Sequence, residues 1–166
     1  DWWVEFQNEL TVHVNDRRLL EAMLVTAGVT AADKQKHVLR VVDKLQKIGV
    51  EDVRRELGGG RFDASGDRIN GVGLEPESID KLLELIAVTG ATRAGVVEAM
   101  TAKLPDNDAN KSALQSMRDL DAALTGLGVS AQDAVFDVSL ARGLAYYTGP
   151  IFEAYLGGAP EMGAIL

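Results

Sequence analysis

The fold is decided by the stretch Phe136-Asp-Val-Ser-Leu-Ala-Arg142-Gly-Leu-Ala-Tyr146-Tyr147-Thr-Gly149-Pro-Ile-Phe-Glu153. Apolar and polar residues alternate over residues 136–140, which is typical of a half-buried strand. A turn is expected around Gly143, and a second β run occupies residues 151–156, after the Gly149-Pro150 pair. Two strands on either side of a glycine-bounded turn predict an antiparallel pair.

A strand and a helix are expected near the other end of the sequence. Apolar residues alternate with polar ones over residues 10–14, and this alternation places His13 on the polar side, solvated or paired at the surface. Asn15 or Asp16 can cap a helix that follows. The apolar stripe of this helix and its stop consist of Leu19, Leu20, Met23, Leu24 and Gly28.

The next part of the chain is predicted to be helical and then irregular. One helix is expected over residues 31–48, because its apolar residues fall on one face, and Gly49 ends it. A short helix follows through Val53 and Leu57. Residues 58–73 contain six glycines and no helical stripe, so a flexible loop is predicted there.

Three more helices are expected before the C-terminal β runs. One starts at Pro76, one is capped by Thr92, and one covers residues 108–127 and is closed by Gly128. The predicted stripe of the last helix consists of Leu114, Met117, Leu120, Leu124 and Leu127. Strands at both ends around a helical middle indicate an α+β fold. The expected parts are a core strand and helix (1–28), a helical insertion (29–128) and core strands (129–166).

The composition excludes several kinds of site. The chain has no cysteine, so disulfides, thiolate zinc sites and cysteine nucleophiles are excluded. His13 and His37 lie far apart without neighbouring ligand patterns, so no metal site is expected. No apolar run is long enough to span a bilayer, and residues 1–5 have neither the basic nor the apolar region of a signal peptide.

The charge is unevenly distributed. A net charge of −8 makes broad electrostatic binding to nucleic acid unfavourable. Residues 33–61 nevertheless carry eight Lys and Arg against five Asp and Glu. This stretch is either a solvated helix face, the interpretation we favour, or a surface that approaches a phosphate backbone.

Arg142 and the two tyrosines after it are the candidate ligand-binding groups. Arginine offers a planar fork of donors that suits carboxylate and phosphate oxygens. Two adjacent tyrosines on an extended chain point to opposite faces, so Tyr146 or Tyr147 can line a pocket while the other packs inward. This composition suits a small anionic ligand with an aromatic or polar side group. From the residues alone, a tyrosine-rich hairpin with a surface arginine is the alternative.

The stretch over residues 136–153 resembles the histidine-specific signature of histidyl-tRNA synthetases. That signature reads Arg-Gly-Leu-Asp-Tyr-Tyr-Thr-Gly, followed by a β run that ends in Phe-Glu. Residues 10–20 are similar to the strand and helix before the family's insertion, and residues 42–45 and 48–57 resemble the insertion's opening helices. The resemblance is collinear over most of the chain. It implies a partial class II synthetase, with an antiparallel-sheet core and a mainly helical insertion.

The resemblance also implies a two-step ligation. The carboxylate of histidine attacks the α-phosphate of ATP to give histidyl-adenylate, and the acyl group then moves to the 3′ end of tRNA. Arg142 matches the arginine at the reaction centre, where a fixed cation stabilises two approaching anions in the transition state. Tyr146 and Tyr147 match the histidine-binding tyrosines, and Gly149 belongs to the same substrate-binding motif. The resemblance further implies Mg²⁺ with the nucleotide, a homodimeric complete enzyme and a cytoplasmic, membrane-free location.

The chain departs from the family pattern in two respects. Ala145 stands where the signature usually has aspartate, which bears on how the loop is held and how the substrate's ammonium is balanced. The three class II motifs, an anticodon domain and the glycine-rich run that usually follows the second β run are not found in the sequence. Gly58-Gly-Gly-Arg-Phe-Asp63 looks like that run but precedes the signature, so we interpret it as coincidental. We therefore expect an internal fragment of the catalytic region, unable to form the adenylate alone.

Two other functions are open on the sequence. The regulatory subunit of ATP phosphoribosyltransferase is a non-catalytic paralogue that shares the synthetase fold and binds histidine-pathway ligands without charging tRNA. Arg142 and the long helical middle favour the synthetase over this paralogue. A stand-alone helical RNA-binding module is the third possibility, and the acidic balance disfavours it.

Overall fold

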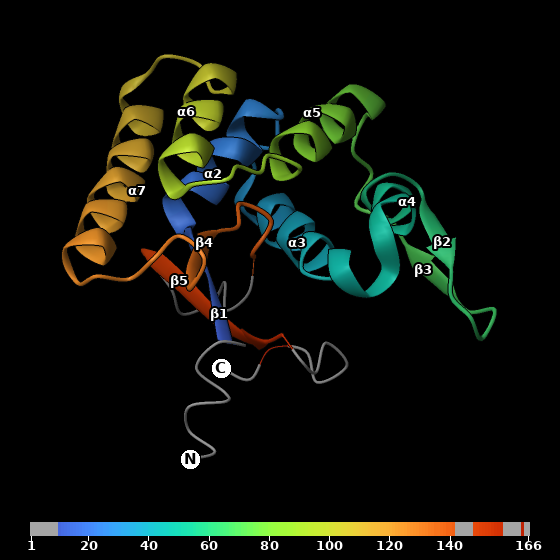
Figure 1. Cartoon of the computed structure of the whole chain (residues 1–166). Helices are drawn as coiled ribbons and strands as arrows, with labels where there is room; N and C mark the ends of the chain where they lie inside the picture. Colours follow the sequence, from blue (N-terminus) through green and yellow to red (C-terminus); the bar gives the residue numbers. More distant parts are fainter. Residues whose placement is uncertain (1–9, 142–147, 158–163, 165–166) are drawn as a thin grey trace.

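A small mixed sheet joins a strand from the first part of the sequence with two strands from its last part (Figure 1). The computed structural model describes residues 10–141, 148–157 and 164. The sheet has the strand order β4-β1-β5, and helices α2 and α7 contact its central strand. Its strands are β1 (Leu10–Asp16), β4 (Ala134–Phe136) and β5 (Pro150–Leu156). The other elements are α2 (Arg17–Thr26), α3 (Ala32–Val42), α4 (Leu45–Leu57), β2 (Gly60–Phe62), β3 (Arg68–Asn70), α5 (Pro76–Ile86), α6 (Arg93–Lys103) and α7 (Asp108–Gly126).

The central strand β1 pairs with both of the others. It runs parallel to β4 and antiparallel to β5, so that Val14 lies between Phe136 and Phe152. The predicted antiparallel pairing of the two C-terminal β runs is therefore wrong, because each run pairs with β1 instead. The first strand also lies earlier than predicted, at Ala134–Phe136 instead of residues 136–140, and shares only Phe136 with the predicted run. The chain turns after Phe136, where the Leu140 N–H donates to the Asp137 carbonyl at 3.1 Å. The central position of β1 buries Val14 completely and gives both of its edges a partner.

The helix α2 follows the sequence pattern closely. Asp16 caps it by accepting a hydrogen bond from the Arg18 N–H at 2.8 Å. Gly28, just past its end, has a φ of +83°, a conformation that favours glycine. The predicted apolar stripe of α2 is buried, and the helix packs against α5, α7 and β1. The predicted cap and stop of this helix are confirmed.

The helix predicted over residues 31–48 is divided in two. α3 ends at Val42 and α4 begins at Leu45, with Asp43 and Lys44 in a turn between them. The apolar spacing continues through this turn, which is why the pattern predicted one helix. The break allows α4 to fold back against α3. Gly49, with a φ of +79°, interrupts the helical geometry within α4, as its predicted role as a stop requires.

The loop predicted over residues 58–73 contains a β-hairpin. Strands β2 and β3 pair antiparallel, and α4 contacts β2. Two of the six glycines that suggested flexibility permit close packing of the backbone instead. A Cβ on Gly60 would lie 2.3 Å from the carbonyl oxygen of Ile69, and one on Gly71 would lie 2.0 Å from the carbonyl oxygen of Gly58. The prediction of a flexible loop is wrong because these glycines permit backbone contact.

The predicted starts of the last three helices are confirmed. Pro76 begins α5, Thr92 caps α6 through its side chain, and α7 begins at Asp108. These helices share one hydrophobic core with α2 and the sheet. Leu127, predicted to belong to the stripe of α7, is 80% exposed because that helix ends at Gly126.

Candidate functional site

One face of the sheet carries polar side chains from all three of its strand regions. The register places His13 directly opposite Glu153 and Thr11 opposite Tyr155, so these side chains share a face. Asp137 follows β4 and reaches the same face, since its side chain contacts His13. Four of these residues, together with Ser139, which contacts Asp137, form what we call the polar row: Ser139, Asp137, His13, Tyr155 and Glu153.

The members of the polar row are joined by short contacts. His13 Nδ1 lies 2.8 Å from Asp137 Oδ2, and the Ser139 hydroxyl donates to Asp137 Oδ1 at 2.5 Å. The imidazole ring of His13 packs against the Tyr155 ring, with 4.5 Å between their centroids. The Tyr155 hydroxyl in turn donates to Glu153 Oε2 at 2.5 Å. His13 is thus paired at the surface of the sheet, as the strand pattern predicts.

Asp137 is held in its charged form by its neighbours. Burial alone would raise the pKa of this carboxyl, but hydrogen bonds from His13 and Ser139 outweigh burial and hold the pKa below its ordinary value. The Ser139 backbone N–H adds a further hydrogen bond to Asp137 Oδ1 at 2.9 Å. The polar row therefore contains a fixed negative charge next to an imidazole.

Acid should reveal the contribution of Asp137 to stability. Because its pKa is lower in the folded protein, this stabilisation is fully present above about pH 4 and is lost as the pH falls through the lowered pKa. The free energy of unfolding, measured with urea at a series of pH values, should fall more steeply on acidification in the wild type than in Asp137→Asn. Asp106→Asn removes an exposed carboxylate paired with Lys111 and should follow the wild-type curve. Parallel curves for wild type and Asp137→Asn would contradict the prediction.

Asn15 holds the first part of the stretch 136–153 that resembles the signature. Its side chain is buried, and Nδ2 donates to the carbonyl oxygens of Val138 at 3.2 Å and Leu140 at 3.0 Å. Its Oδ1 accepts from the Asp16 N–H at 2.9 Å, so the amide group is used on both sides. The sequence offered Asn15 and Asp16 as alternative caps. The structure assigns the cap to Asp16, and the Asn15 side chain links β1 to the residues just before Arg142.

A small pocket of 70 Å³ lies beside the polar row. One wall is the α3–α4 elbow, by which we mean residues 42–47. The other walls are residues 139–141 and the side of β5 that carries Glu153 and Tyr155. Larger surface hollows lie between α6 and α7 and beside α2, but they contain no residue of the signature. The pocket at the elbow is therefore the candidate binding site.

The three side chains predicted to bind or react, Arg142, Tyr146 and Tyr147, lie outside the described residues. The described chain stops at Ala141, which lines the pocket, and resumes at Thr148.

Gly149, the fourth predicted site residue, lies just before β5. Its carbonyl accepts a hydrogen bond from the Arg17 N–H at 2.9 Å, which ties the start of β5 to the first residue of α2. A Cβ at Gly149 would meet nothing within 4 Å, so the described residues give no steric reason for glycine there.

The sequence pattern did not reveal the polar row as a unit. His13 and Asp137 are 124 positions apart, and only the pairing of β1 with β4 brings them together. The membership of Glu153 could have been predicted from the sequence. It ends the signature and lies two residues before Tyr155 on a strand, so both side chains share a face. Within the described ranges, no three His, Cys, Asp or Glu side chains are placed to hold a metal ion. No helix in the described part of the chain is long and apolar enough to cross a membrane.

Comparison with known families identifies the fold that surrounds this site. The profile of a family described as histidyl-tRNA synthetase matches residues 4–164, nearly the whole chain. The chain belongs to the histidyl-tRNA synthetase family. Its match includes both β1 and the signature, so the mixed sheet and the pocket lie within the shared region.

Curated relatives in the histidyl-tRNA synthetase family are named histidine–tRNA ligases. The protein from Caulobacter vibrioides is 39% identical over 145 residues, which cover 86% of this chain and 29% of that protein. The protein from Paracoccus denitrificans is 35% identical over 150 residues, covering 90% of this chain and 30% of that protein. This chain therefore spans less than a third of the length of the relatives it matches.

Solved structures share the fold. A histidyl-tRNA synthetase from Nostoc sp. PCC 7120 superposes with a TM-score of 0.79 over 98% of this chain and 36% of that one, at 22% identity. A Bacillus halodurans protein, described as an ATP phosphoribosyltransferase regulatory subunit/histidyl-tRNA synthetase, superposes with a TM-score of 0.65 over 89% of this chain and 34% of that one, also at 22% identity. At this identity the two structures establish the α+β fold alone, so the activity has to be inferred from the site.

Proposed function

We propose that this chain forms one wall of the histidine site in a class II histidine–tRNA ligase. The observation that carries the proposal is the place of the signature in the fold. Residues 139–141, which lead into Arg142, line the same pocket as Glu153, the last residue of the signature. Family membership over residues 4–164 supports the same conclusion. The ligase would activate histidine with ATP and then transfer it to tRNA.

The proposed chemistry divides the work among a few side chains. Arg142 lies between the histidine carboxylate and the α-phosphate and stabilises both as they approach. Tyr146 and Tyr147 meet the imidazole with a hydroxyl and a ring, and Gly149 completes the substrate-binding motif. A site built on such polar contacts rejects analogues without ring nitrogens, because its own groups would lose their partners. Ala145 has no carboxylate to balance the positive ammonium group of histidine. The buried carboxylate of Glu153 is proposed to supply that negative charge.

The remaining parts of the proposal concern the complete enzyme. ATP arrives with Mg²⁺ as a substrate, tRNA is the acceptor, and the complete ligase is a cytoplasmic homodimer. Within this chain, residues 1–28 and 129–166 contribute to the catalytic core, and residues 29–128 form the helical insertion. The chain spans less than a third of its relatives' length, which supports the proposal that the other walls of the site lie elsewhere in a longer protein.

Histidine-dependent exchange of pyrophosphate into ATP tests this function. The complete protein that contains this chain should catalyse the exchange with histidine, and the isolated 166-residue chain should not. Robust exchange by the isolated chain would overturn its assignment as an incomplete part of the site. Absence of exchange by the complete protein would overturn the ligase assignment.

The second candidate function is that of the regulatory paralogue. The likeness to the Bacillus halodurans structure, whose description names both proteins, is the observation that favours it. A regulatory subunit would bind histidine without exchanging pyrophosphate into ATP. Histidine binding by the complete protein, measured by calorimetry, together with the exchange assay separates the two functions.

A further inference from the structure

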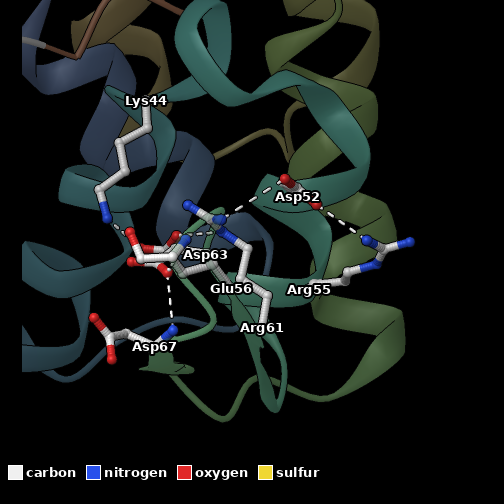
Figure 2. A network of polar contacts seen from close by, with 8 residues as sticks. Lys44, Asp52, Arg55, Glu56, Arg61, Asp63 and Asp67 are labelled. Carbon is white, nitrogen blue, oxygen red and sulfur yellow. Dashed lines mark hydrogen bonds and ion pairs between the residues drawn. The ribbon is translucent and has the colours of Figure 1, made fainter.

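A buried carboxylate lies at the centre of an ion network outside the signature (Figure 2). Glu56 on α4 is only 2% exposed. Its Oε1 accepts from the Lys44 ammonium, and its Oε2 accepts from Arg61 Nε at 3.1 Å. A buried carboxylate is costly to leave unpaired, so two cations on one carboxylate hold it in a defined position.

The network joins three separate elements. Lys44 belongs to the α3–α4 elbow, Glu56 to the last turn of α4, and Arg61 to strand β2. Arg61 also approaches Asp52 Oδ2 at 3.7 Å, one turn earlier on α4. The backbone adds to this connection, because the Val72 N–H after β3 donates to the Glu56 carbonyl at 2.9 Å. The hairpin and α4 therefore form one braced unit, and Lys44 connects it to the elbow.

The position of Lys44 determines the position of the pocket wall. Its neighbours Asp43 and Leu45 line the pocket together with Gln46 and Lys47. The Lys44 carbonyl accepts from the Lys47 N–H at 2.8 Å and so begins the first turn of α4. Fixing Lys44 at its side chain and its carbonyl thus fixes the wall that faces the polar row.

We propose that Glu56 is a positioning residue that holds the α3–α4 elbow over the histidine pocket, with the β2–β3 hairpin as its brace. The proposal rests on the proposed function, since it assigns a ligand to the pocket. Glu56 does not line the pocket, so it acts through Lys44. Its loss should weaken the binding of free histidine more than the steps that follow.

Replacing Glu56 by glutamine in the complete protein is the first test. The amide keeps the shape of the side chain but removes the charge that holds Lys44 and Arg61. The KM for histidine in the exchange reaction should rise about tenfold, because small displacements of a positioning group have large effects. The kcat and the KM for ATP should stay nearly unchanged. Equal effects on histidine and ATP, or an unchanged KM for histidine, would overturn the proposal.

Glu84 supplies a matched control. It also accepts from two cations, Lys81 and Lys103, but it is exposed on α5, and neither lysine belongs to the elbow. Glu84→Gln should leave the KM for histidine unchanged. A rise equal to that of Glu56→Gln would overturn the proposal, because it would show a general effect of removing charge.

Two substitutions at the other side of the contact extend the test. Lys44→Met should reproduce the effect of Glu56→Gln, and Lys44→Arg should retain most of the wild-type affinity because it keeps the cation. These variants decide the question if Glu56→Gln does not fold. An unchanged KM for histidine in Lys44→Met would contradict the positioning role.

Hydrogen exchange separates this inference from the proposed function. The Lys47 and Ile48 amides, which both donate to the Lys44 carbonyl, should exchange faster in Glu56→Gln than in the wild type, while Glu84→Gln matches the wild type. If the complete protein shows no histidine-dependent activity, the proposed function fails, and faster amide exchange still supports the positioning of the elbow. Unchanged exchange at both amides would overturn it.

Discussion

Replacing Arg142 by alanine in the complete enzyme should lower the rate of histidyl-adenylate formation by about a hundredfold or more. In the proposed function both reactants are anions, and the guanidinium is assigned the role of stabilising them as they approach. The effect should appear mainly in the rate of the chemical step, measured by single-turnover adenylate formation at saturating histidine and ATP. Histidine affinity should change less, since Tyr146 and Tyr147 are the proposed contacts of the imidazole.

Two further variants make the Arg142 prediction specific. Arg142→Lys keeps the charge but not the planar fork, so its rate should lie between those of the wild type and Arg142→Ala. Arg68→Ala removes an exposed arginine from the hairpin and should leave the adenylation rate unchanged. Unchanged adenylation in Arg142→Ala would remove Arg142 from its assigned role.

The largest expected effect on stability comes from Arg93, the first residue of α6. Its side chain is buried, and every guanidinium N–H donor group has an acceptor close by. The acceptors are Asp121 Oδ1 at 2.6 Å, Ser130 O at 2.8 Å, Ala134 O at 3.0 Å, Val129 O at 3.1 Å and Thr125 Oγ1 at 3.2 Å. Arg93 thus ties α6 to the end of α7 and to the chain that enters β4.

Arg93→Ala should lower the free energy of unfolding by about 3 kcal/mol, because it leaves several buried acceptors and a carboxylate without their partner. Urea unfolding followed by helical circular dichroism measures this loss. Arg93→Lys should recover only a small part of the lost free energy of unfolding, since the compact ammonium of lysine cannot reach acceptors that surround a planar guanidinium. Arg118→Ala, an exposed arginine on α7, should cost less than about 1 kcal/mol. A similar loss in Arg93→Ala and Arg118→Ala would contradict the prediction.

Arg93 also illustrates why part of the structure could not be predicted. An arginine in the first turn of a helix is unfavourable next to the helix dipole, so its position suggests a solvated side chain. Its acceptors lie between 28 and 41 positions away in the sequence, and no local spacing relates them. The same holds for Asn15, whose carbonyl partners lie more than 120 positions away. Long-range polar contacts of this kind follow from the packing of whole elements.

The sequence by itself determined the family signature, the α+β class and the starts of most helices. α2 shows why: its cap, its stripe and Gly28 all act within a few residues of one another. Only the tertiary structure decided that β1 is the central strand, that the polar row forms, and that residues 58–73 contain a hairpin with close backbone contacts at Gly60 and Gly71. Nearly every residue offers the same backbone donor and acceptor, so these groups do not specify which strands pair. The alternation of apolar and polar residues in a strand indicates its buried face but not its partner strand. The pairing of β1 with β4 and β5 depends on how the helices between them pack. The candidate site depends on this pairing, because its side chains come from these strands and the residues next to them.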